Sequence, residues 1–517
     1  MAQINVSNLT FCYEGGFDYI FEEVSFCLDT DWKLGFIGRN GKGKTTFLRI
    51  LQGKLAYQGT ISATTVFDYF PYEVSDEQKK LCAVELLEAW KPGCELWRVC
   101  VELEKLQISA ETIYRPFETL SHGERTKIML GVLFAGENDF LLIDEPTNHL
   151  DYEARNVVKE YLKKKKGFLL VSHDRDLLDA CIDHVLVLNR KTIEIQSGNF
   201  SSWWENKLRK DKFAEMENEK HIKEISQLRQ AADRSNRWAI KNENTKIGFD
   251  PIKEPDRMKN TRGYIGAKTK KAQKRVKQYE RRIEREIEEK EGLLQDIENP
   301  VELKLNPLSY HKEVLVRARK YSLSYTNTNA DNCKEILSDL SIELKRGERV
   351  FLHGENGCGK SSLMKAILMH AGQLADEKNG RQFQVNEKGN LSVGSGIIIS
   401  YINQDTSYLK GTIRDFCKER QLDESLFCAI LRQLDLERVQ FTKVLEDYSE
   451  GQKKKVLIAA SLMTPAHLYI WDEPLNYIDV FSRMQIESLI QKFQPTMLLV
   501  DHDIRFQEKI ATRVINL

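Results

Sequence analysis

Two stretches of this sequence share a glycine-rich pattern that ends in a lysine and a hydroxyl residue. They are GRNGKGKT at residues 38–45 and GENGCGKS at residues 354–361. Each follows a short apolar run, WKLGFI or ERVFLH, which predicts a buried strand leading into the loop. The glycines allow backbone N–H groups to turn toward phosphates at the positive end of the following helix. The pattern therefore predicts two sites for nucleotide phosphates.

The residues expected at the phosphates form two equivalent sets. Lys44 and Lys360 should reach the β- and γ-phosphates, and Thr45 and Ser361 should hold Mg²⁺. The full sets are Gly38, Asn40, Gly41, Gly43, Lys44, Thr45 and Thr46 in the first site, and Gly354, Asn356, Gly357, Gly359, Lys360, Ser361 and Ser362 in the second.

Three further motifs occur twice in the same order. LSHGE at 120–124 recurs as YSEGQ at 448–452, FLLIDEP at 140–146 as LYIWDEP at 468–474, and VSHD at 171–174 as VDHD at 500–503. Ser121 precedes Asp144 by 23 residues, and Ser449 precedes Asp472 by 23 residues. Repetition at matching spacing predicts a duplicated domain rather than a chance match to one loop pattern.

The repeated Asp-Glu pairs follow short apolar runs that predict buried parallel strands. Asp144 and Asp472 suit a Mg²⁺ shell, because the metal prefers carboxylate oxygens beside nucleotide phosphates. Glu145 and Glu473 suit orienting or deprotonating an attacking water. A surface loop carboxylate is the alternative, but a strand end beside a phosphate loop favours the catalytic interpretation.

A histidine follows a third apolar run in each copy. His173 follows FLLV and His502 follows MLLV, at the same place in the two repeats. A lone histidine is more often structural than catalytic. Its repetition at one offset favours a contact to the γ-phosphate.

Length and composition limit the class of protein. A chain of 517 residues is too long for a single core and predicts several domains. Charged residues make up 30% and hydrophobic residues 41%, with a formal net charge of zero, which is typical of a soluble globular protein. We see no signal peptide and no apolar run near the ~20 residues of a membrane span. Ten cysteines without a CxxC pair favour reduced thiols and a cytoplasmic location.

These motifs resemble those of the ATP-binding cassette family, and the resemblance covers both halves. It implies an α/β fold with two cassettes, at 1–200 and 300–517, which bind ATP and Mg²⁺ head to tail within one monomer. The signature residues Ser121, Gly123, Ser449 and Gly451 would each face a γ-phosphate held by the other cassette. Tyr13 and Tyr325 lie where the family stacks an aromatic ring on adenine, although each could equally belong to the core.

The first copy departs from the family pattern at a residue expected to bind Mg²⁺. The family has a glutamine after the second main strand, and the second copy keeps it as Gln404 in SYINQD. The first copy reads DYFPYEV, so Tyr72 stands at that position, and a neutral phenol is a poor ligand for a hard metal. The signatures also carry His122 and Glu450 in place of a glycine. We therefore expect unequal sites, with the first slower.

Residues 201–299 differ in character from both cassettes. Apolar residues at three and four spacing predict two antiparallel helices, and a Pro-, Gly- and Asn-rich stretch between them predicts the loop of a hairpin. Six basic residues lie between positions 268 and 277 without an acidic neighbour, which favours a polyphosphate partner over a solvated helix face. These candidate RNA-binding residues are Lys268, Lys270, Lys271, Lys274, Arg275 and Lys277.

Two cassettes joined by such a linker resemble the ABC-F class of ribosome-associated factors. YFPYEV, IDEPTNHLD and YIWDEPLNYIDVF are similar to the bacterial Lsa/Vga-type antibiotic-resistance members. The resemblance implies ribosome protection: an ATPase that enters the tRNA exit site of a drug-stalled 70S ribosome, contacts 23S rRNA and P-site tRNA, and promotes release of lincosamides, streptogramin A or pleuromutilins.

The tip of the linker would then approach the drug site. It corresponds to residues 238–265, and its apolar candidates are Ile247, Phe249, Tyr264 and Ile265. Packing of these side chains within the loop itself is an equal alternative. Two other functions stay open: a housekeeping ABC-F translation factor without drug specificity, and the soluble ATPase of an efflux transporter.

Overall fold

The computed structural model describes most of the chain. The described residues are 3–13, 19–39, 43–136, 139–148, 150–188, 193–244, 274, 278, 281–282, 285, 304–326, 334–355, 357–373, 384–436 and 438–517. The chain divides into two compact units, one made of Met1–Trp203 with Val301–Leu517 and the other of Trp204–Pro300. The first unit contains both repeats.

The first cassette contains two sheets. A three-stranded antiparallel sheet has the order β2-β1-β4, and a six-stranded sheet has the order β5-β6-β7-β3-β8-β9, parallel except for β9. Its strands are β1 (Gln3–Phe11), β2 (Phe21–Asp29), β3 (Lys33–Gly38), β4 (Gln58–Ser62), β5 (Val66–Phe70), β6 (Asp139–Asp144), β7 (Phe168–Val171), β8 (His184–Leu188) and β9 (Ile193–Ser197). Its helices are α1 (Lys44–Leu51), α2 (Ala83–Trp90), α3 (Leu96–Lys105), α4 (His122–Leu133), α5 (Tyr152–Lys163) and α6 (Arg175–Cys181).

The second cassette repeats this plan. Its antiparallel sheet has the order β11-β10-β13, and its parallel sheet has the order β14-β15-β16-β12-β17. Its strands are β10 (Val314–Thr326), β11 (Lys334–Lys345), β12 (Arg349–His353), β13 (Gln384–Val393), β14 (Ile399–Ile402), β15 (Leu468–Asp472), β16 (Met497–Val500) and β17 (Arg513–Asn516). Its helices are α9 (Lys360–His370), α10 (Ile413–Glu419), α11 (Glu424–Gln433), α12 (Glu450–Met463), α13 (Val480–Phe493) and α14 (Ile504–Ile510).

The two parallel sheets have the same strand order, which confirms the predicted α/β fold with two cassettes. Strand β3 and its equivalent β12 each lie beside the strand that precedes a repeated histidine, β7 or β16. The apolar runs FLLI and LYIW form β6 and β15, as predicted, and both strands are buried. Their burial on both faces explains why the sequence shows continuous apolar runs rather than alternation.

A buried phenylalanine on α1 joins the two sheets of the first cassette. Phe47 is fully buried, and its ring lies 5.9 Å from Phe21, 5.9 Å from Phe26 and 5.4 Å from Phe36. Phe21 and Phe26 belong to β2, whereas Phe36 belongs to β3. The helix that begins at the phosphate loop is therefore fixed between both sheets by aromatic packing.

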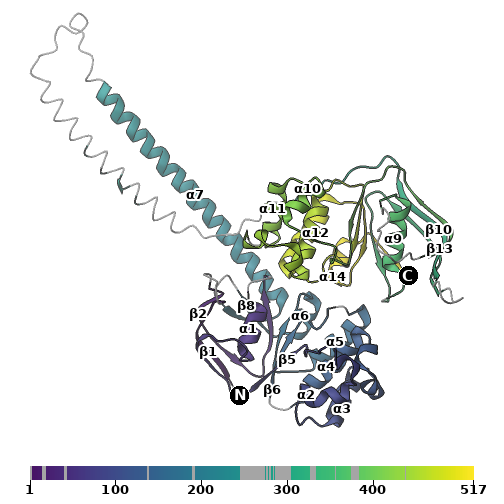
Figure 1. Ribbon diagram of the computed structural model, residues 1–517. Coiled ribbons are helices and arrows are strands. Elements are labelled where there is room, and N and C mark those ends of the chain that lie inside the picture. Colours follow the sequence, from purple (N-terminus) through teal and green to yellow (C-terminus); the bar gives the residue numbers. More distant parts are fainter. Residues whose placement is uncertain are drawn as a thin grey trace, which may run out of the picture. The chain divides into compact units, whose positions relative to one another are not determined.

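A long helix, α7 (Phe200–Asn244), follows the first cassette, and from Trp204 onward it makes up most of the described residues of the second unit (Figure 1). The first of the two predicted helices is confirmed, and it begins at Phe200. In the predicted second arm, Lys274 and four other described residues are helical and exposed. Residues 245–273, which include Lys268, Lys270, Lys271 and the whole of the predicted apolar tip set, lie outside the described residues, as do Arg275 and Lys277.

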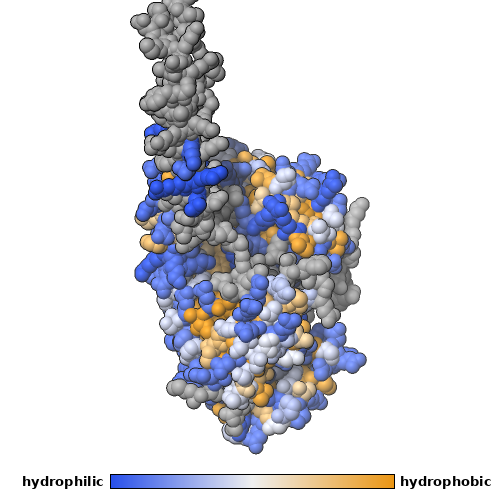
Figure 2. Space-filling model, turned by 90° about the vertical axis from the view of Figure 1, so that its left-hand side faces the viewer, coloured by the Kyte–Doolittle hydropathy of each residue, from blue (hydrophilic) through white to orange (hydrophobic). Residues whose placement is uncertain are grey.

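The surface of the described residues mixes polar and apolar side chains. On the face drawn in Figure 2, hydrophobic residues form separate patches between hydrophilic ones, as expected for a protein in water. No helix among the described residues has the length and hydropathy needed to cross a bilayer.

We predict that Gly59 is essential to the three-stranded sheet. Its φ is 109°, and a Cβ there would lie 2.5 Å from the carbonyl oxygen of Asn8 and 2.7 Å from that of Ser7. Because these are backbone atoms, Gly59→Ala should destabilise the protein by about 3 kcal/mol, measured by thermal unfolding. Gly53→Ala is the control: φ is 71° but nothing lies within 4 Å, so the loss should be only about 1 kcal/mol. Equal losses would show that φ alone matters.

Candidate functional site

The phosphate loops lie at the ends of β3 and β12. Gly43 and Gly359 precede α1 and α9 with φ of 104° and 101°, a conformation that favours glycine. Lys44 Nζ donates to the carbonyl oxygen of Gly38 at 2.5 Å. Lys360 Nζ donates to the carbonyl oxygens of Gly354 and Glu355, each at 2.8 Å. Both ammonium groups are therefore held at the loop that the sequence assigns to phosphates.

Some predicted nucleotide-binding residues cannot be placed. Asn40, Gly41 and Asn356 lie outside the described residues, as does the side chain of Tyr325, whose backbone belongs to β10. Tyr13 is described: its hydroxyl shares a 2.9 Å hydrogen bond with Thr46 Oγ1, and its ring is half-exposed beside Phe11. This places Tyr13 next to the first phosphate loop, while stacking on adenine stays a prediction.

The carboxylate–histidine pairs meet at the same edge of each sheet. His173 Nε2 lies 3.3 Å from Glu145 Oε1, and His502 Nε2 lies 3.5 Å from Glu473 Oε1. Glu145 and Glu473 both have left-handed backbones, with φ of 50° and 48°. Each backbone N–H is anchored at 2.9 Å to the adjacent strand, at the carbonyl oxygen of Val171 or Val500. The unusual φ is thus held by strand pairing and aims both side chains off the sheet edge.

Burial changes the protonation of the first pair. Burial, together with the neighbouring Asp144 carboxylate, raises the pKa of Glu145 to about 8. Burial, followed by the Lys44 ammonium, lowers the pKa of His173 well below its ordinary value, so the ring is neutral. Perturbed acids and bases of this kind cluster at functional sites.

The second site fits a hard divalent cation. Burial raises the pKa of Asp472, and its buried Oδ1 atom has no hydrogen-bond partner. Ser361 donates to this carboxylate, and Gln404 lies beside Glu473, to which its Nε2 donates at 2.9 Å. Asn476 Nδ2 donates to the same Glu473 oxygen at 2.6 Å. Ser361, Asp472 and Gln404 together offer hydroxyl, carboxylate and amide oxygens, which suit Mg²⁺.

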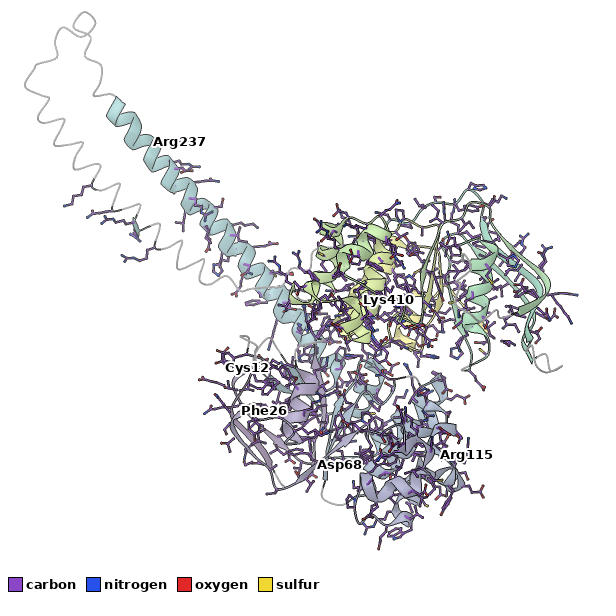
Figure 3. The ribbon with its side chains drawn as sticks, in the orientation of Figure 1. Cys12, Phe26, Asp68, Arg115, Arg237 and Lys410 are labelled. Carbon is purple, nitrogen blue, oxygen red and sulfur yellow. The ribbon has the colours of Figure 1, made fainter. Side chains whose placement is uncertain are left out.

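The first site differs, as Tyr72 led us to expect. Strand registers pair Phe70 with Ile143 and Ile402 with Trp471, so Tyr72 stands at the position of Gln404. Its hydroxyl donates to Asp68, labelled in Figure 3, at 2.8 Å, and its ring stacks on Trp90.

Tyr69, which the sequence analysis missed, lies beside the first metal position instead. Its hydroxyl donates to Asp144 Oδ2 at 3.2 Å, and Thr45 Oγ1 donates to the same oxygen at 3.4 Å. Burial, followed by Asp144, raises the pKa of Tyr69, so the hydroxyl keeps its proton and offers a donor rather than a metal ligand. No short sequence signal indicates this contact, because the strand registers align Tyr69 with Tyr401 and not with Gln404. Thr45 and Asp144 stay the candidate ligands here.

The signature serines begin α4 and α12. Ser121 Oγ accepts from the backbone N–H of Glu124 at 3.2 Å, and Ser449 Oγ accepts from that of Gln452 at 3.3 Å. Both form capping boxes. A Cβ at Gly451 would lie 2.6 Å from the Tyr477 carbonyl oxygen, so that glycine is required by close backbone approach. Each signature is thus a rigid helix N-terminus able to face an anion.

Groups from the second cassette reach the first site. Asp479 is the strongest carboxylate acting on Lys44, and Lys455 and Arg483 act on His173. Lys455 Nζ forms a 2.9 Å ion pair with Asp479 Oδ2, and both are buried. Burial alone would raise the pKa of Asp479, but Lys455 holds it well below its ordinary value. The first site is therefore built from both cassettes.

The contacts between the cassettes differ on the two sides of their interface. Arg175, directly after Asp174 in α6, forms a buried ion pair with Glu487 on α13, where Arg175 Nη1 donates at 3.1 Å. In the other cassette, Ile504 takes the place of Arg175, and Lys159 takes the place of Glu487, eight residues after the cap of α5.

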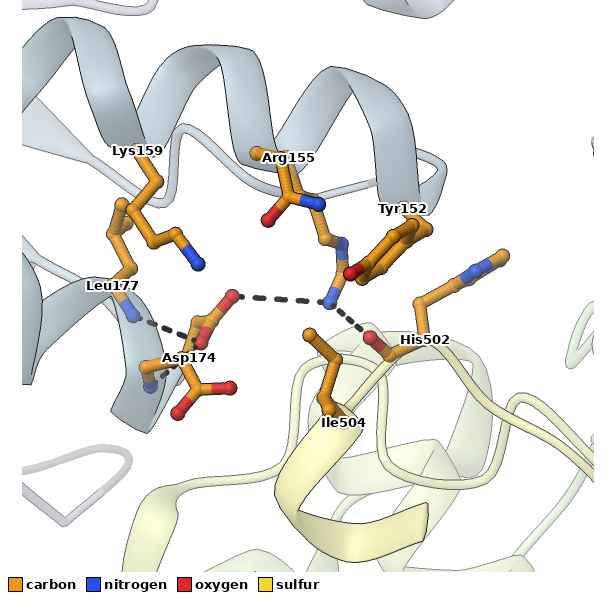
Figure 4. Close-up of a pocket in the computed structure, with 9 residues that line it drawn as sticks. Tyr152, Arg155, Lys159, Asp174, Leu177, His502 and Ile504 are labelled. Carbon is orange, nitrogen blue, oxygen red and sulfur yellow. Dashed lines mark hydrogen bonds and ion pairs between the residues drawn. The ribbon is translucent and has the colours of Figure 1, made fainter. Parts of the chain in front are cut away.

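No equivalent ion pair is described on that opposite side. Figure 4 shows Lys159, Ile504 and Arg155 around a small pocket there, where Arg155 Nη1 donates to the carbonyl oxygen of His502 at 3.3 Å. The two halves of the interface therefore differ in charge and packing, although the parallel sheets of the two cassettes have the same strand order.

Comparisons with known proteins agree with this arrangement. A family model described as ABC transporter matches residues 21–148 and 337–476. The chain is 26% identical to the ribosome protection protein VmlR of Bacillus subtilis (strain 168), over 96% of this chain and 84% of that protein. It is also 26% identical to the ATP-binding protein Uup of Buchnera aphidicola, over 99% and 80%.

A solved structure shares the fold at lower identity. The archaeal ribosome recycling factor aABCE1, in complex with the ribosomal stalk protein aP1, aligns with a TM-score of 0.57 and 18% identity, over 98% of this chain and 87% of that chain. This similarity shows that the two chains share a fold.

We predict unequal contributions of the two glutamates to ATP turnover. Glu473→Gln should lower steady-state turnover about 100-fold, because it removes the catalytic carboxylate from the second site, which keeps Gln404. Glu145→Gln should lower it far less, because Tyr69 and Tyr72 leave the first site with fewer oxygen ligands. Phosphate release assays at saturating Mg²⁺ and ATP measure both. Equal losses would contradict the inequality.

We also predict that the Arg175–Glu487 pair stabilises only one side of the interface. Arg175→Met should cost about 3 kcal/mol of apparent stability, because among the described residues it leaves the buried Glu487 carboxylate with Lys509 alone as its partner. Lys159→Met, at the position equivalent to Glu487, is the control and should stay within about 0.5 kcal/mol. Thermal unfolding measures both. A recovery in the Arg175→Met, Glu487→Met double variant would identify the pair itself as the cause.

Proposed function

The chain belongs to the ATP-binding cassette family, and on that basis we propose that it is a ribosome-associated ABC-F protein that protects translation from antibiotics. Membership makes it an ATPase. We infer that the energy of ATP is used on the ribosome. Drug-stalled ribosomes are the target, entry is through the tRNA exit site, and the drugs are lincosamides, streptogramin A and pleuromutilins that occupy the peptidyl-transferase centre.

One observation carries the proposal: the similarity to a protein named for ribosome protection extends over 96% of this chain, and so includes the region between the cassettes. That region begins with a single helix of 45 residues, which at 1.5 Å per residue is about 68 Å long. A helix of this length is suited to reach far from the ATP sites. The basic run from Lys268 to Lys277 supplies uncompensated positive charge for ribosomal RNA and tRNA phosphates.

Each ATP site uses residues of both cassettes. Lys44 and Lys360 bind the phosphates, while Ser449 and Ser121 reach them from the opposite cassette. Glu145 and Glu473 orient and deprotonate the attacking water, and His173 and His502 contact the γ-phosphate. Mg²⁺, when bound, neutralises charge on the transferred phosphoryl group. ATP would thereby hold the cassettes together, and hydrolysis would release them.

The test is ribosome co-sedimentation of the Glu145→Gln, Glu473→Gln variant. Both substitutions should keep ATP bound and the cassettes closed, so with ATP the protein should sediment with 70S particles. Lincomycin should increase the bound fraction if drug-stalled ribosomes are the target. The same protein without ATP is the control, and a variant with Gln at the six basic positions 268–277 should bind less and show a weaker salt dependence.

The outcomes separate the alternatives. Binding with equal strength with and without lincomycin would favour a housekeeping translation factor. Absence from the ribosomal fractions under all conditions would overturn the proposal and favour the ATPase of an efflux transporter.

A further inference from the structure

The segment that carries Gln404 is tied to the signature helix of its own cassette at two points. Lys454 Nζ, on α12, donates to the carbonyl oxygen of Asn403 at 3.0 Å. Thr406 Oγ1 donates to Glu450 Oε2, one turn earlier on the same helix, at 2.6 Å. One contact lies before Gln404 and the other after it. We call these two contacts the α12 clamp.

The donors of both contacts are buried, whereas the accepting Glu450 carboxylate is half-exposed. Lys454 is 3% exposed and Thr406 is 2% exposed. A buried ammonium is costly unless carbonyl or carboxylate oxygens surround it. Burial lowers the pKa of Lys454, while the carboxylates of Asp472 and Glu473 act in the opposite direction. Lys454 is therefore not part of a solvated charged face: it lies within the electrostatic reach of the metal and catalytic carboxylates.

The residue between the two contacts of the α12 clamp, Gln404, binds the predicted catalytic carboxylate of Glu473. Gln404 Nε2 donates to Glu473 Oε2 at 2.9 Å, and that oxygen also accepts from Asn476. Gln404 itself is exposed and lies just after β14, where no strand pairing holds it. Its direction therefore depends on how the backbone on either side of it is fixed.

The residues at the equivalent positions of the first cassette cannot form the same clamp. The strand registers and the repeated signature place Pro71, Val74, His122 and Thr126 at the positions of Asn403, Thr406, Glu450 and Lys454. Thr126 is too short to replace a lysine, and Val74 has no hydroxyl to donate. The clamp therefore accompanies the glutamine: the cassette that keeps Gln404 has it, and the cassette with Tyr72 does not.

We propose that Glu450 and Lys454 are positioning residues for ATP hydrolysis at the second site. They act through residues 403–406, whose backbone they fix so that the Gln404 amide is directed at Glu473. The role differs from that of a signature residue, because it serves the site of the same cassette.

The experiment uses the full chain with Glu145→Gln, so that the second site supplies the measured turnover. Lys454→Thr introduces the residue of the first cassette, and Thr406→Val removes the other contact with little change in volume. Each should lower kcat about tenfold, the size of effect found when a group supporting a catalytic ligand is removed. The KM for ATP should change little, and Lys454→Arg should restore part of kcat. Lys410→Thr, an exposed lysine four residues beyond the segment (Figure 3), is the matched control.

Hydrogen exchange of the nucleotide-free protein gives a second readout that does not depend on turnover. Amides of residues 403–408 should exchange faster in Lys454→Thr and Thr406→Val, while amides in β15 should be unaffected. Unchanged exchange in this segment, or a rise in KM with kcat preserved, would overturn the proposal. If Lys454→Thr does not fold, Thr406→Val decides by the same two measurements.

Discussion

Parallel pairing of three neighbouring strands is the constraint on which both sites depend. In the first cassette β3 pairs with β7 and β7 with β6, and in the second β12 pairs with β16 and β16 with β15. This register puts the phosphate loop, the Asp-Glu pair and the histidine at one carboxyl edge. A shift by one residue would turn every side chain to the other face, so Asp144 opposite Val171 and Asp472 opposite Val500 are fixed together with the sheet.

The sequence was most informative where local pattern and burial coincide. Continuous apolar runs such as FLLI predicted strands because a strand covered on both faces needs apolar residues at every position. The repeat predicted that both cassettes have the same fold and carry the same kind of nucleotide site. The family, the fold and the ATPase activity followed from these motifs and agree with the comparisons. The roles of individual residues within each site stay predictions.

Contacts between distant segments could not be predicted in the same way. Arg175 and Glu487 are 312 positions apart, and neither carries a local signal for an ion pair. The sequence placed Tyr72 at the position equivalent to Gln404, and the strand registers agree. The tyrosine hydroxyl that reaches Asp144, however, belongs to Tyr69. That choice depends on Asp68, which accepts from Tyr72 and pairs with Lys91 beyond the end of α2. Side-chain direction is set by tertiary partners that no short motif contains.

The ion pairs between Arg505 and α6 affect which cassettes can pair with each other. Arg505 forms ion pairs with Asp176 and Asp179, and by the repeat Arg505 and Asp176 occupy equivalent positions in the two cassettes. Two copies of the first cassette would bring Asp176 against Asp176, and two copies of the second would bring Arg505 against Arg505. Like charges therefore discriminate against both homotypic assemblies, while the mixed pair is attractive. The difference between Asp176 and Arg505 therefore favours pairing of the two different cassettes within one chain.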